Sequence, residues 1–241
     1  MKYHFDAVIF DLDGVITKTA LVHSRAWKKM FDGFLAHHAE KTSTGFSEFD
    51  HEKDYLPYVD GKPRYKGVQS FLESRNINLP YGDPDDHPEL ETVCGLGNRK
   101  NEAFNDVLDK EGVEVYQSTV ELIKKLKDKG LRVGVASSSK NCKAVLEAAR
   151  ISDLFDQVVD GEVAERLRLP GKPRPDTFLA AAERLGVVRE RAVVVEDAIS
   201  GVRAGRAGGF GLVIGVDRKG DPESLRQGGA DIVVRDLSEL V

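Results

Sequence analysis

Buried-strand patterns and amphipathic-helix patterns alternate along most of this 241-residue chain. Val8, Ile9 and Phe10 form an apolar run with no polar interruption, which predicts a strand buried on both faces of a parallel sheet. After residue 112 the two patterns follow one another repeatedly, and this order predicts an α/β fold with a doubly wound, Rossmann-like parallel sheet. We expect strands at 131–136, 157–159, 192–195, 212–216 and 231–234, and helices at 118–129, 140–150, 177–185 and 199–207.

Residues 18–111 carry helical and loop patterns without a convincing buried strand. Apolar residues recur at helical spacing after Thr19, an N-cap candidate, and further helices are expected at 67–74 and 100–108. A loop rich in proline and aspartate covers 79–91. A helical insertion so soon after the first strand predicts two domains, a core of residues 1–17 and 112–241 and an α-helical cap of residues 18–111.

Composition narrows the class of protein. Hydrophobic residues make up 41% and charged residues 31%, as in ordinary globular domains. No apolar run approaches the roughly 18 residues of a membrane helix, and the chain begins on a structural strand, so we expect a cytoplasmic protein with no membrane partner. A net charge of −5 without a basic run argues against nucleic acid as a partner. Cys94 and Cys142 lack disulfide or zinc spacing and are expected to be packing residues.

Two carboxylates directly follow the first strand. Asp11 and Asp13 are two residues apart, so in strand geometry they point to the same side, and Gly14 then allows a sharp exit. Carboxylates this close repel each other unless a cation or a shared proton neutralises them. The usual cation is Mg²⁺; the alternative is a solvated acidic turn.

Other polar residues follow two later strands, at the sheet edge where α/β proteins bind ligands. Ser137 follows the strand at 131–136, just before a helix expected to begin near Lys140, and is either an anion site or an ordinary helix cap. Glu196 and Asp197 follow the strand at 192–195 and either cap the next helix or join the first two carboxylates in binding a metal.

Lys172 stands in the string LPGKPRPD, between a glycine and a proline. A lone loop lysine is usually a solvated surface residue, but here it precedes a predicted helix, which Asp176 is expected to cap.

The string FDLDGV at 10–15, behind a buried strand, resembles the nucleophile motif of the haloacid dehalogenase superfamily of phosphotransferases. The resemblance implies that Asp11 is the nucleophile and Asp13 the general acid/base. It further implies that Ser137 holds the transferring phosphoryl group. The string GKPRPD at 171–176 is similar to one that recurs in this superfamily, which implies that Lys172 neutralises nucleophile and phosphate. An Asp at position 13 is absent from the dehalogenases and phosphonate hydrolases of this superfamily, so the resemblance implies phosphate-ester chemistry.

The same resemblance implies a Mg²⁺ cofactor. Asp11 and Asp197 would bind it through carboxylates and Asp13 through its backbone carbonyl, while Glu196 would contact it directly or from just outside the ligand set.

Within the superfamily, the run FDLDGVITKTALVHSRAW at 10–27 is similar to the opening of the β-phosphoglucomutase family. The strings SSSKN at 137–141, GKPR at 61–64 and RKN at 99–101 are similar to further motifs of that family. The family resemblance implies that Arg64 grips the phosphate that is not transferred, and that His23 links cap closure to the acid/base. The implied substrate-binding set is Thr19, His23, Trp27, Arg64, Lys100, Asn101, Ser138, Ser139, Lys140 and Asn141.

Plain structural roles remain open for three of these residues: a surface arginine at 64, a solvated histidine at 23 and a helix-face charge at 100. The chain also departs from the family pattern in its longer segment 161–171, in an insertion at 78–91, in Gln117-Ser118 and in Lys18. These departures leave the exact sugar open.

The implied function is a Mg²⁺-dependent phosphosugar mutase that interconverts β-glucose 1-phosphate and glucose 6-phosphate through an aspartyl-phosphate and a 1,6-bisphosphate. The alternative is a sugar-phosphate phosphatase with the same core, in which water accepts the phosphoryl group. A non-catalytic phosphosugar sensor is a third possibility, disfavoured because no motif residue is missing. We expect a monomer, because a mobile cap needs free space.

Overall fold

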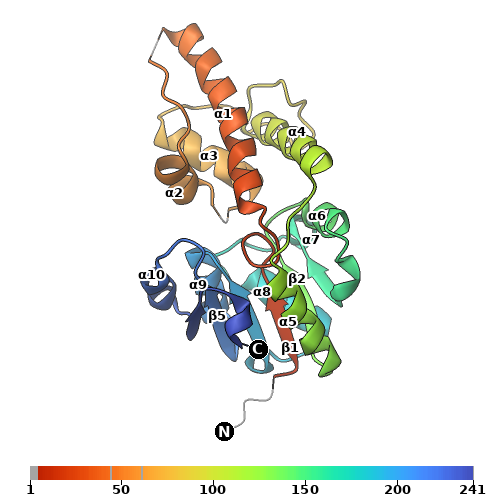
Figure 1. The fold of residues 1–241 in the computed structure, drawn as a ribbon. Coiled ribbons are helices and arrows are strands. Elements are labelled where there is room, and N and C mark those ends of the chain that lie inside the picture. Colours follow the sequence, from red (N-terminus) through yellow and green to blue (C-terminus); the bar gives the residue numbers. More distant parts are fainter. Residues whose placement is uncertain (1–4, 44, 61, 241) are drawn as a thin grey trace. The chain divides into compact units, whose positions relative to one another are not determined.

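The computed structural model of the chain describes residues 5–43, 45–60 and 62–240. Its contacts divide the chain into two compact units. Unit 1 comprises Met1–Thr19 and Val113–Val241, and unit 2 comprises Ala20–Gly112. The chain therefore leaves unit 1 shortly after its first strand and returns to it at residue 113 (Figure 1).

Unit 1 contains a six-stranded parallel sheet in the order β3-β2-β1-β4-β5-β6. The order reverses between β1 and β4, the point at which α/β sheets bind ligands beyond their strand ends. The predicted doubly wound sheet is confirmed. The strands are β1 Ala7–Phe10, β2 Arg132–Ala136, β3 Gln157–Val159, β4 Ala192–Glu196, β5 Leu212–Val216 and β6 Ile232–Val234.

Helices cover this sheet and bury its apolar side chains. Helix α8 packs on β1, β2 and β3, and α9 packs on β4 and β5; Phe178 and Val202 from these helices are fully buried with Ile9 and Val194 of the sheet. The helices of unit 1 are α5 Gln117–Asp128, α6 Cys142–Ala148, α7 Gly161–Arg166, α8 Asp176–Leu185, α9 Ile199–Ala207 and α10 Pro222–Gly228, with short 3₁₀ turns at Ser152–Leu154, Arg189–Arg191 and Leu237–Leu240.

Two of these helices were not predicted. Helix α7 begins after Asp160, whose side chain accepts a hydrogen bond from the Val163 N–H at 2.8 Å. Helix α10 begins after Asp221, which caps the Ser224 N–H at 3.1 Å, with Pro222 in the first helical position. Both starts carry ordinary capping signals, so the sequence contained the information.

The expected role of Asp176 is wrong. Pro175 occupies the N-cap position of α8 and no side chain caps that end; Asp176 is the first helical residue. A carboxylate in the first turn still favours the helix through the positive end of its dipole.

Unit 2 is helical around an aromatic core. Phe31 of α1 lies 5.4 Å from Trp27, 5.0 Å from Phe49 and 4.1 Å from Phe71, measured between ring centroids. Helices α1 and α3 both pack on α4. The elements are α1 Ala20–Thr42, a π-helical turn His51–Tyr55, α2 Leu56–Tyr58, α3 Arg64–Ser74 and α4 Val93–Glu111.

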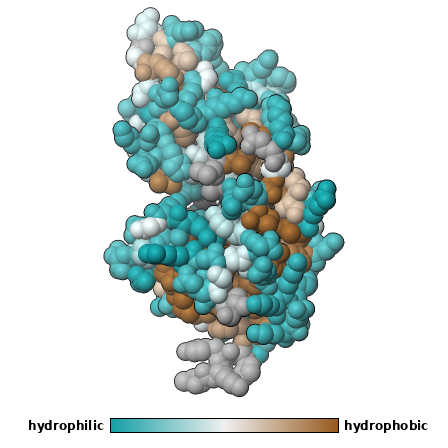
Figure 2. All heavy atoms as spheres, in the orientation of Figure 1, coloured by the Kyte–Doolittle hydropathy of each residue, from teal (hydrophilic) through white to brown (hydrophobic). Residues whose placement is uncertain are grey.

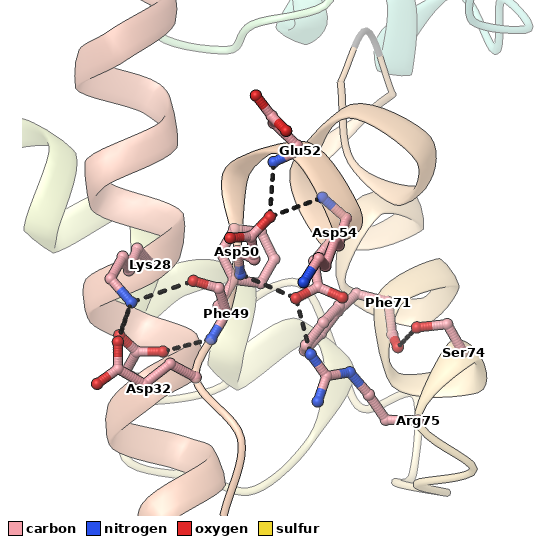
Figure 3. A network of polar contacts seen from close by, with 11 residues as sticks. Lys28, Asp32, Phe49, Asp50, Glu52, Asp54, Phe71, Ser74 and Arg75 are labelled. Atoms are coloured by element: carbon pink, nitrogen blue, oxygen red, sulfur yellow. Dashed lines mark hydrogen bonds and ion pairs between the residues drawn. The ribbon is translucent and has the colours of Figure 1, made fainter.

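A polar network holds Phe49 and Asp50, which directly precede the π-helical turn (Figure 3). The Asp54 carboxylate accepts from the Asp50 N–H at 2.8 Å and from Arg75 at 2.7 Å. On α1, Lys28 pairs with Asp32 at 2.7 Å and donates to the Phe49 carbonyl at 3.1 Å. Residues from α1, the turn and the end of α3 are thereby held together.

Helix α4 is longer than the predicted 100–108. It starts after Thr92, whose hydroxyl accepts from the Gly95 N–H at 2.9 Å. Gly95 and Gly97 weaken the helical signal of the sequence. Gly97 is nevertheless required, because a Cβ there would lie 2.6 Å from a ring carbon of Tyr65.

The face seen in Figure 2 is mostly hydrophilic, with apolar residues in small groups. Cys94 and Cys142 are buried, as expected of packing residues, and neither forms a disulfide among the residues that the structure describes. Among the residues that the structure describes, no helix has both the length and the apolar character that a membrane crossing requires.

Candidate active site

The sheet order brings three strand ends of unit 1 together. Strand β1 pairs on one side with β4, where Phe10 lies opposite Val195, and on the other side with β2, where Phe10 lies opposite Val135. The Asp11 N–H continues the ladder by donating to the Val195 carbonyl at 2.9 Å. Asp11 therefore lies between Glu196 and the residues that follow β2.

Lys172 joins two of these carboxylates. Its ammonium donates to Asp11 through a very short contact, to Glu196 Oε1 at 2.6 Å and to the Ala136 carbonyl at 3.3 Å. Its side chain is only 3% exposed, and the ammonium lies 4.8 Å from the Phe178 ring centroid. Lys172 is thus a buried counter-ion of the acidic cluster, not a solvated loop residue.

The cluster is still short of positive charge. Burial raises the pKa of Asp11 to about 8, with a smaller contribution from Glu196 and Asp13, although the Lys172 ammonium opposes this rise. Burial alone would lower the pKa of Lys172, but the carboxylates of Asp11 and Glu196 outweigh it and raise that pKa. A raised pKa at Asp11 means that the site holds a proton or a cation in order to neutralise its carboxylates.

The carboxylates fit a divalent cation. Asp11, Glu196 and Asp197 each offer an oxygen, and these oxygens lie within 4.8 Å of one another. Hard oxygen donors of this kind suit Mg²⁺. The donor set, its convergence and its deficit of positive charge all match such an ion.

Two glycines hold the carboxylates in place. A Cβ on Gly14, whose φ is +88°, would lie 2.0 Å from Asp197 Oδ2, and a Cβ on Gly201 would lie 1.6 Å from Glu196 Oε1. The Ala198 N–H donates to the other Glu196 oxygen at 2.8 Å. The first turn of α9 is therefore shaped around Glu196.

We predict that Gly201→Ala displaces Glu196 from Lys172 and lowers kcat/KM by about 10- to 100-fold, because small displacements of catalytic groups are costly. Gly33→Ala is the matched control, because its new Cβ would meet nothing within 4 Å in helix α1. The control should keep its activity and gain up to about 1 kcal/mol in stability. Steady-state kinetics and thermal melts check both variants, and a Gly201→Ala enzyme with wild-type kinetics would contradict the role of this contact.

A row of hydroxyls leads away from Asp13. The Thr19 hydroxyl contacts Asp13 Oδ1 very closely and lies 2.6 Å from the Thr17 hydroxyl, which lies 3.2 Å from the Leu12 carbonyl. The row therefore has three contacts but only two hydroxyl protons. If Asp13 is protonated, it donates the third proton, and each hydroxyl then donates toward the Leu12 carbonyl. If Asp13 is ionised, both hydroxyls donate in the opposite direction, toward its carboxylate.

The loop after β2 is held by its own side chains. Ser137 is buried, and its hydroxyl accepts from the Ser139 N–H at 3.1 Å, while the Ser139 hydroxyl accepts from the Asn141 N–H at 3.2 Å. These contacts delay the helix, so α6 begins at Cys142, two residues later than predicted. Ser138 lies half-buried in the same loop, and Lys140 pairs with Glu165 at 2.7 Å.

Unit 2 groups the remaining predicted residues into two clusters. In the first, the Lys100 ammonium is 2.7 Å from His23 Nδ1 and lies over the rings of Trp27 at 5.2 Å and Phe104 at 4.9 Å. Lys100 is only 4% exposed, so it is not a solvated helix-face charge.

In the second cluster, Arg64 Nη2 donates to Asn101 Oδ1 at 2.7 Å. Arg64 is the first residue of α3, and it comes from the predicted GKPR string, of which Gly61 lies outside the described residues. Arg64 of α3 and Asn101 of α4, both in the implied substrate-binding set, therefore lie side by side.

Two contributors to the site were missed in the sequence. Thr17 extends the hydroxyl row from Asp13, and Gly201 makes room for Glu196. Neither has a local signal, because a threonine in a loop and a glycine in a helix are common for other reasons. The short spacing from Asp13 through Thr17 to Thr19 is the one feature that could have suggested the hydroxyl row.

Comparisons with known proteins identify the family of this chain. The family model of haloacid dehalogenase-like hydrolases matches residues 5–209. The chain is 48% identical over 238 residues to a β-phosphoglucomutase of Mycobacterium bovis, covering 98% of this chain and 91% of that protein. It is 33% identical to the β-phosphoglucomutase of Bacillus subtilis, covering 97% and 91%. The crystal structure of β-phosphoglucomutase from Clostridium difficile superposes with a TM-score of 0.79 at 27% identity, covering 98% of this chain and 93% of that one.

Proposed function

Because this chain belongs to the haloacid dehalogenase-like hydrolases, and within them to the β-phosphoglucomutase-like phosphotransferases, we propose that it interconverts β-glucose 1-phosphate and glucose 6-phosphate. The proposed route passes through an aspartyl-phosphate at Asp11 and a 1,6-bisphosphate, with Mg²⁺ as cofactor. The observation that carries the proposal is the buried cluster in which Asp11, Glu196 and Lys172 meet, in a chain with 48% identity to a β-phosphoglucomutase.

Mg²⁺ would be held by carboxylate oxygens of Asp11 and Asp197, with Glu196 binding it directly or from just outside the ligand set. The backbone carbonyl of Asp13 would be a further ligand. When bound, the ion supplies the positive charge that the cluster lacks, and it neutralises the oxygens of a transferring phosphoryl group.

Asp11 attacks phosphorus in line, the bond from phosphorus to the leaving oxygen breaks, and the phosphoryl group becomes attached to the carboxylate. Lys172 orients this carboxylate and opposes the rise of its pKa that burial causes. The ammonium also faces the developing charge as a compact point charge. The Ser137 loop adds a hydroxyl and backbone N–H groups that can hold the phosphoryl oxygens.

Asp13 exchanges the proton of the sugar hydroxyl. In the forward direction it accepts the proton from the hydroxyl that attacks phospho-Asp11, and in the reverse direction it returns the proton to the leaving oxygen. The Thr19 and Thr17 hydroxyls support this exchange, because reversing their donor direction satisfies either protonation state of Asp13.

The residues of unit 2 would recognise the rest of the substrate. Arg64, already oriented by Asn101, presents a planar guanidinium suited to the phosphate that is not transferred. Lys100 adds an ammonium that His23 and Trp27 hold in position. Both clusters supply cations for a substrate that carries two phosphates at the midpoint of the reaction.

A sugar-phosphate phosphatase is the second candidate, because the matching family model is that of hydrolases. It would use the same Asp11 chemistry with water as the second acceptor. The two functions differ in the acceptor, which the core residues do not determine.

The test is to incubate the protein with Mg²⁺, β-glucose 1-phosphate and a trace of the 1,6-bisphosphate, and to measure glucose 6-phosphate and inorganic phosphate together. A mutase yields glucose 6-phosphate as the main product. Inorganic phosphate as the main product would refute the mutase in favour of the phosphatase. The α anomer of glucose 1-phosphate is the control substrate and should be turned over poorly.

A further inference from the structure

Arg218 connects the loop that carries Asp13 to the opposite end of the chain. It follows β5 by two residues, and its side chain is 16% exposed. Its Nε donates to the Gly14 carbonyl at 2.8 Å, and its Nη1 donates to the Arg235 carbonyl at 3.1 Å. One guanidinium thus bridges the first loop of unit 1 and the turn that follows β6.

Each of three consecutive backbone carbonyls in this loop accepts a hydrogen bond from a different residue. The Val15 carbonyl accepts from the Thr119 hydroxyl at 2.7 Å, and the Ile16 carbonyl accepts from the Tyr116 N–H at 2.9 Å. The Gly14 carbonyl is the one held by Arg218. Donors from outside the loop therefore fix three consecutive peptide groups.

Of these three peptide groups, that of Gly14 is nearest to the chemistry. Gly14 directly follows Asp13, and its positive φ brings its Cα so close to Asp197 that a Cβ would collide with the carboxylate. The held carbonyl belongs to the Gly14–Val15 peptide group. A rotation of that group would change the ψ angle of Gly14, the residue that packs against Asp197 and links this group to the Asp13 carbonyl. The contact with Arg218 restrains that rotation.

Arg218 also packs on the ring of Tyr116, but this packing does not by itself require an arginine. The guanidinium lies 3.6 Å from the Tyr116 ring centroid, and its Nη2 is buried without a hydrogen-bond partner among the described residues. A methionine would cover the same ring without burying an unpaired donor. The arginine differs in its planar guanidinium, whose N–H donors reach the carbonyls of Gly14 and Arg235 at a fixed separation.

We propose that Arg218 is a positioning residue for phosphoryl transfer: it holds the Gly14–Val15 peptide group, and thereby fixes the turn at Gly14 that lies between the Asp13 carbonyl and the Asp197 carboxylate, two groups that would bind Mg²⁺. This inference rests on the proposed function for the identity of the reaction. Arg218 is not one of the residues proposed to bind substrate or metal.

The test compares Arg218→Gln and Arg218→Lys with wild type, and uses Arg235→Gln as the control. The Arg235 side chain is exposed, while its backbone carbonyl, the part that Arg218 contacts, is kept in the control. Three quantities are measured: kcat and KM, the Mg²⁺ dissociation constant by calorimetry without substrate, and the melting temperature. Guanidinium ion is then added to each variant at concentrations that leave wild type unaffected.

We expect Arg218→Gln to lower kcat by about 10- to 100-fold, with KM changed less than threefold and Mg²⁺ binding weakened. Arg218→Lys should behave similarly, because an ammonium cannot bond both carbonyls as the fork does, and guanidinium should restore part of the kcat of Arg218→Gln. Arg235→Gln should match wild type. If Arg218→Gln does not fold, the same criteria apply to Arg218→Lys.

Wild-type kcat and Mg²⁺ affinity in a folded Arg218 variant with a lowered melting temperature would overturn the inference, because the residue would then be merely structural. A rise in KM alone would also overturn it. If wild type does not convert β-glucose 1-phosphate, the proposed function has failed, and Arg218 is then tested on phosphoryl transfer from acetyl phosphate and on Mg²⁺ affinity. The two failures are therefore distinguishable.

Discussion

Asp11→Asn lowers turnover of β-glucose 1-phosphate by about 10⁴-fold or more, the scale seen when a covalent nucleophile is removed. The amide has the shape of the carboxylate but cannot accept a phosphoryl group in a stable linkage. The variant should also fold as well as wild type, because the substitution removes one negative charge from a cluster of repelling carboxylates, in which burial raises the pKa of Asp11 to about 8.

Loss of turnover without loss of stability is the diagnostic combination, measured by steady-state kinetics and thermal unfolding of the same preparation. Asp6→Asn is the control, since Asp6 forms a half-exposed ion pair with Arg191 just before β1. The control should retain activity within about twofold, as is usual for substitutions of exposed ion pairs. An Asp11→Asn enzyme with appreciable turnover would show that another group accepts the phosphoryl group.

Lys172→Met has the second large expected effect, because it removes the ammonium that pairs with Asp11 and Glu196 and leaves carboxylates buried without their partner. Breaking a buried ion pair in this way costs about 3–5 kcal/mol of stability. Turnover should fall by about 10²- to 10³-fold or more, the range found on removing one charge-stabilising group from an active site.

The loss of stability in Lys172→Met should depend on pH. Burial already raises the pKa of Asp11 from 3.8 to about 8, and loss of the ammonium raises it further. The folded variant then holds protons that the unfolded chain releases, so its stability is greatest below the unfolded pKa and is lost as pH rises through 8 and above. Added Mg²⁺ should offset part of this loss.

Melting temperatures from pH 5 to pH 9, with and without Mg²⁺, check this expectation. Lys127→Met is the control, because Lys127 forms a partly exposed pair with Asp156 at 3.1 Å. A Lys172→Met protein with the stability and pH profile of the control would mean that the lysine is not the counter-ion of the cluster.

The sequence predicted the parts of this molecule that depend on local pattern. Parallel strands leave uninterrupted apolar runs, and their carboxyl ends meet at one edge of the sheet, so the sequence alone places Asp11 and Glu196 together. Lys172 was found only through its resemblance to a family string, because nothing local distinguishes a buried loop lysine from a solvated one.

What the sequence did not predict depends on contacts between distant segments. Arg218 meets Gly14 across 204 positions of the chain, and Gly201 matters only because the Glu196 side chain fills the space beside it. Helix α10 is a different case, since Asp221 and Pro222 marked its start. Its seven residues were too short for hydrophobic periodicity to reveal.

The most direct measurement is the transfer of radioactive phosphate from labelled glucose 1,6-bisphosphate to the protein in the presence of Mg²⁺, followed by identification of the labelled peptide after rapid quenching. The account predicts label on the peptide that contains Asp11, chased from it by unlabelled β-glucose 1-phosphate and absent from Asp11→Asn. Label on a different peptide, or full turnover without any label on the protein, would contradict it.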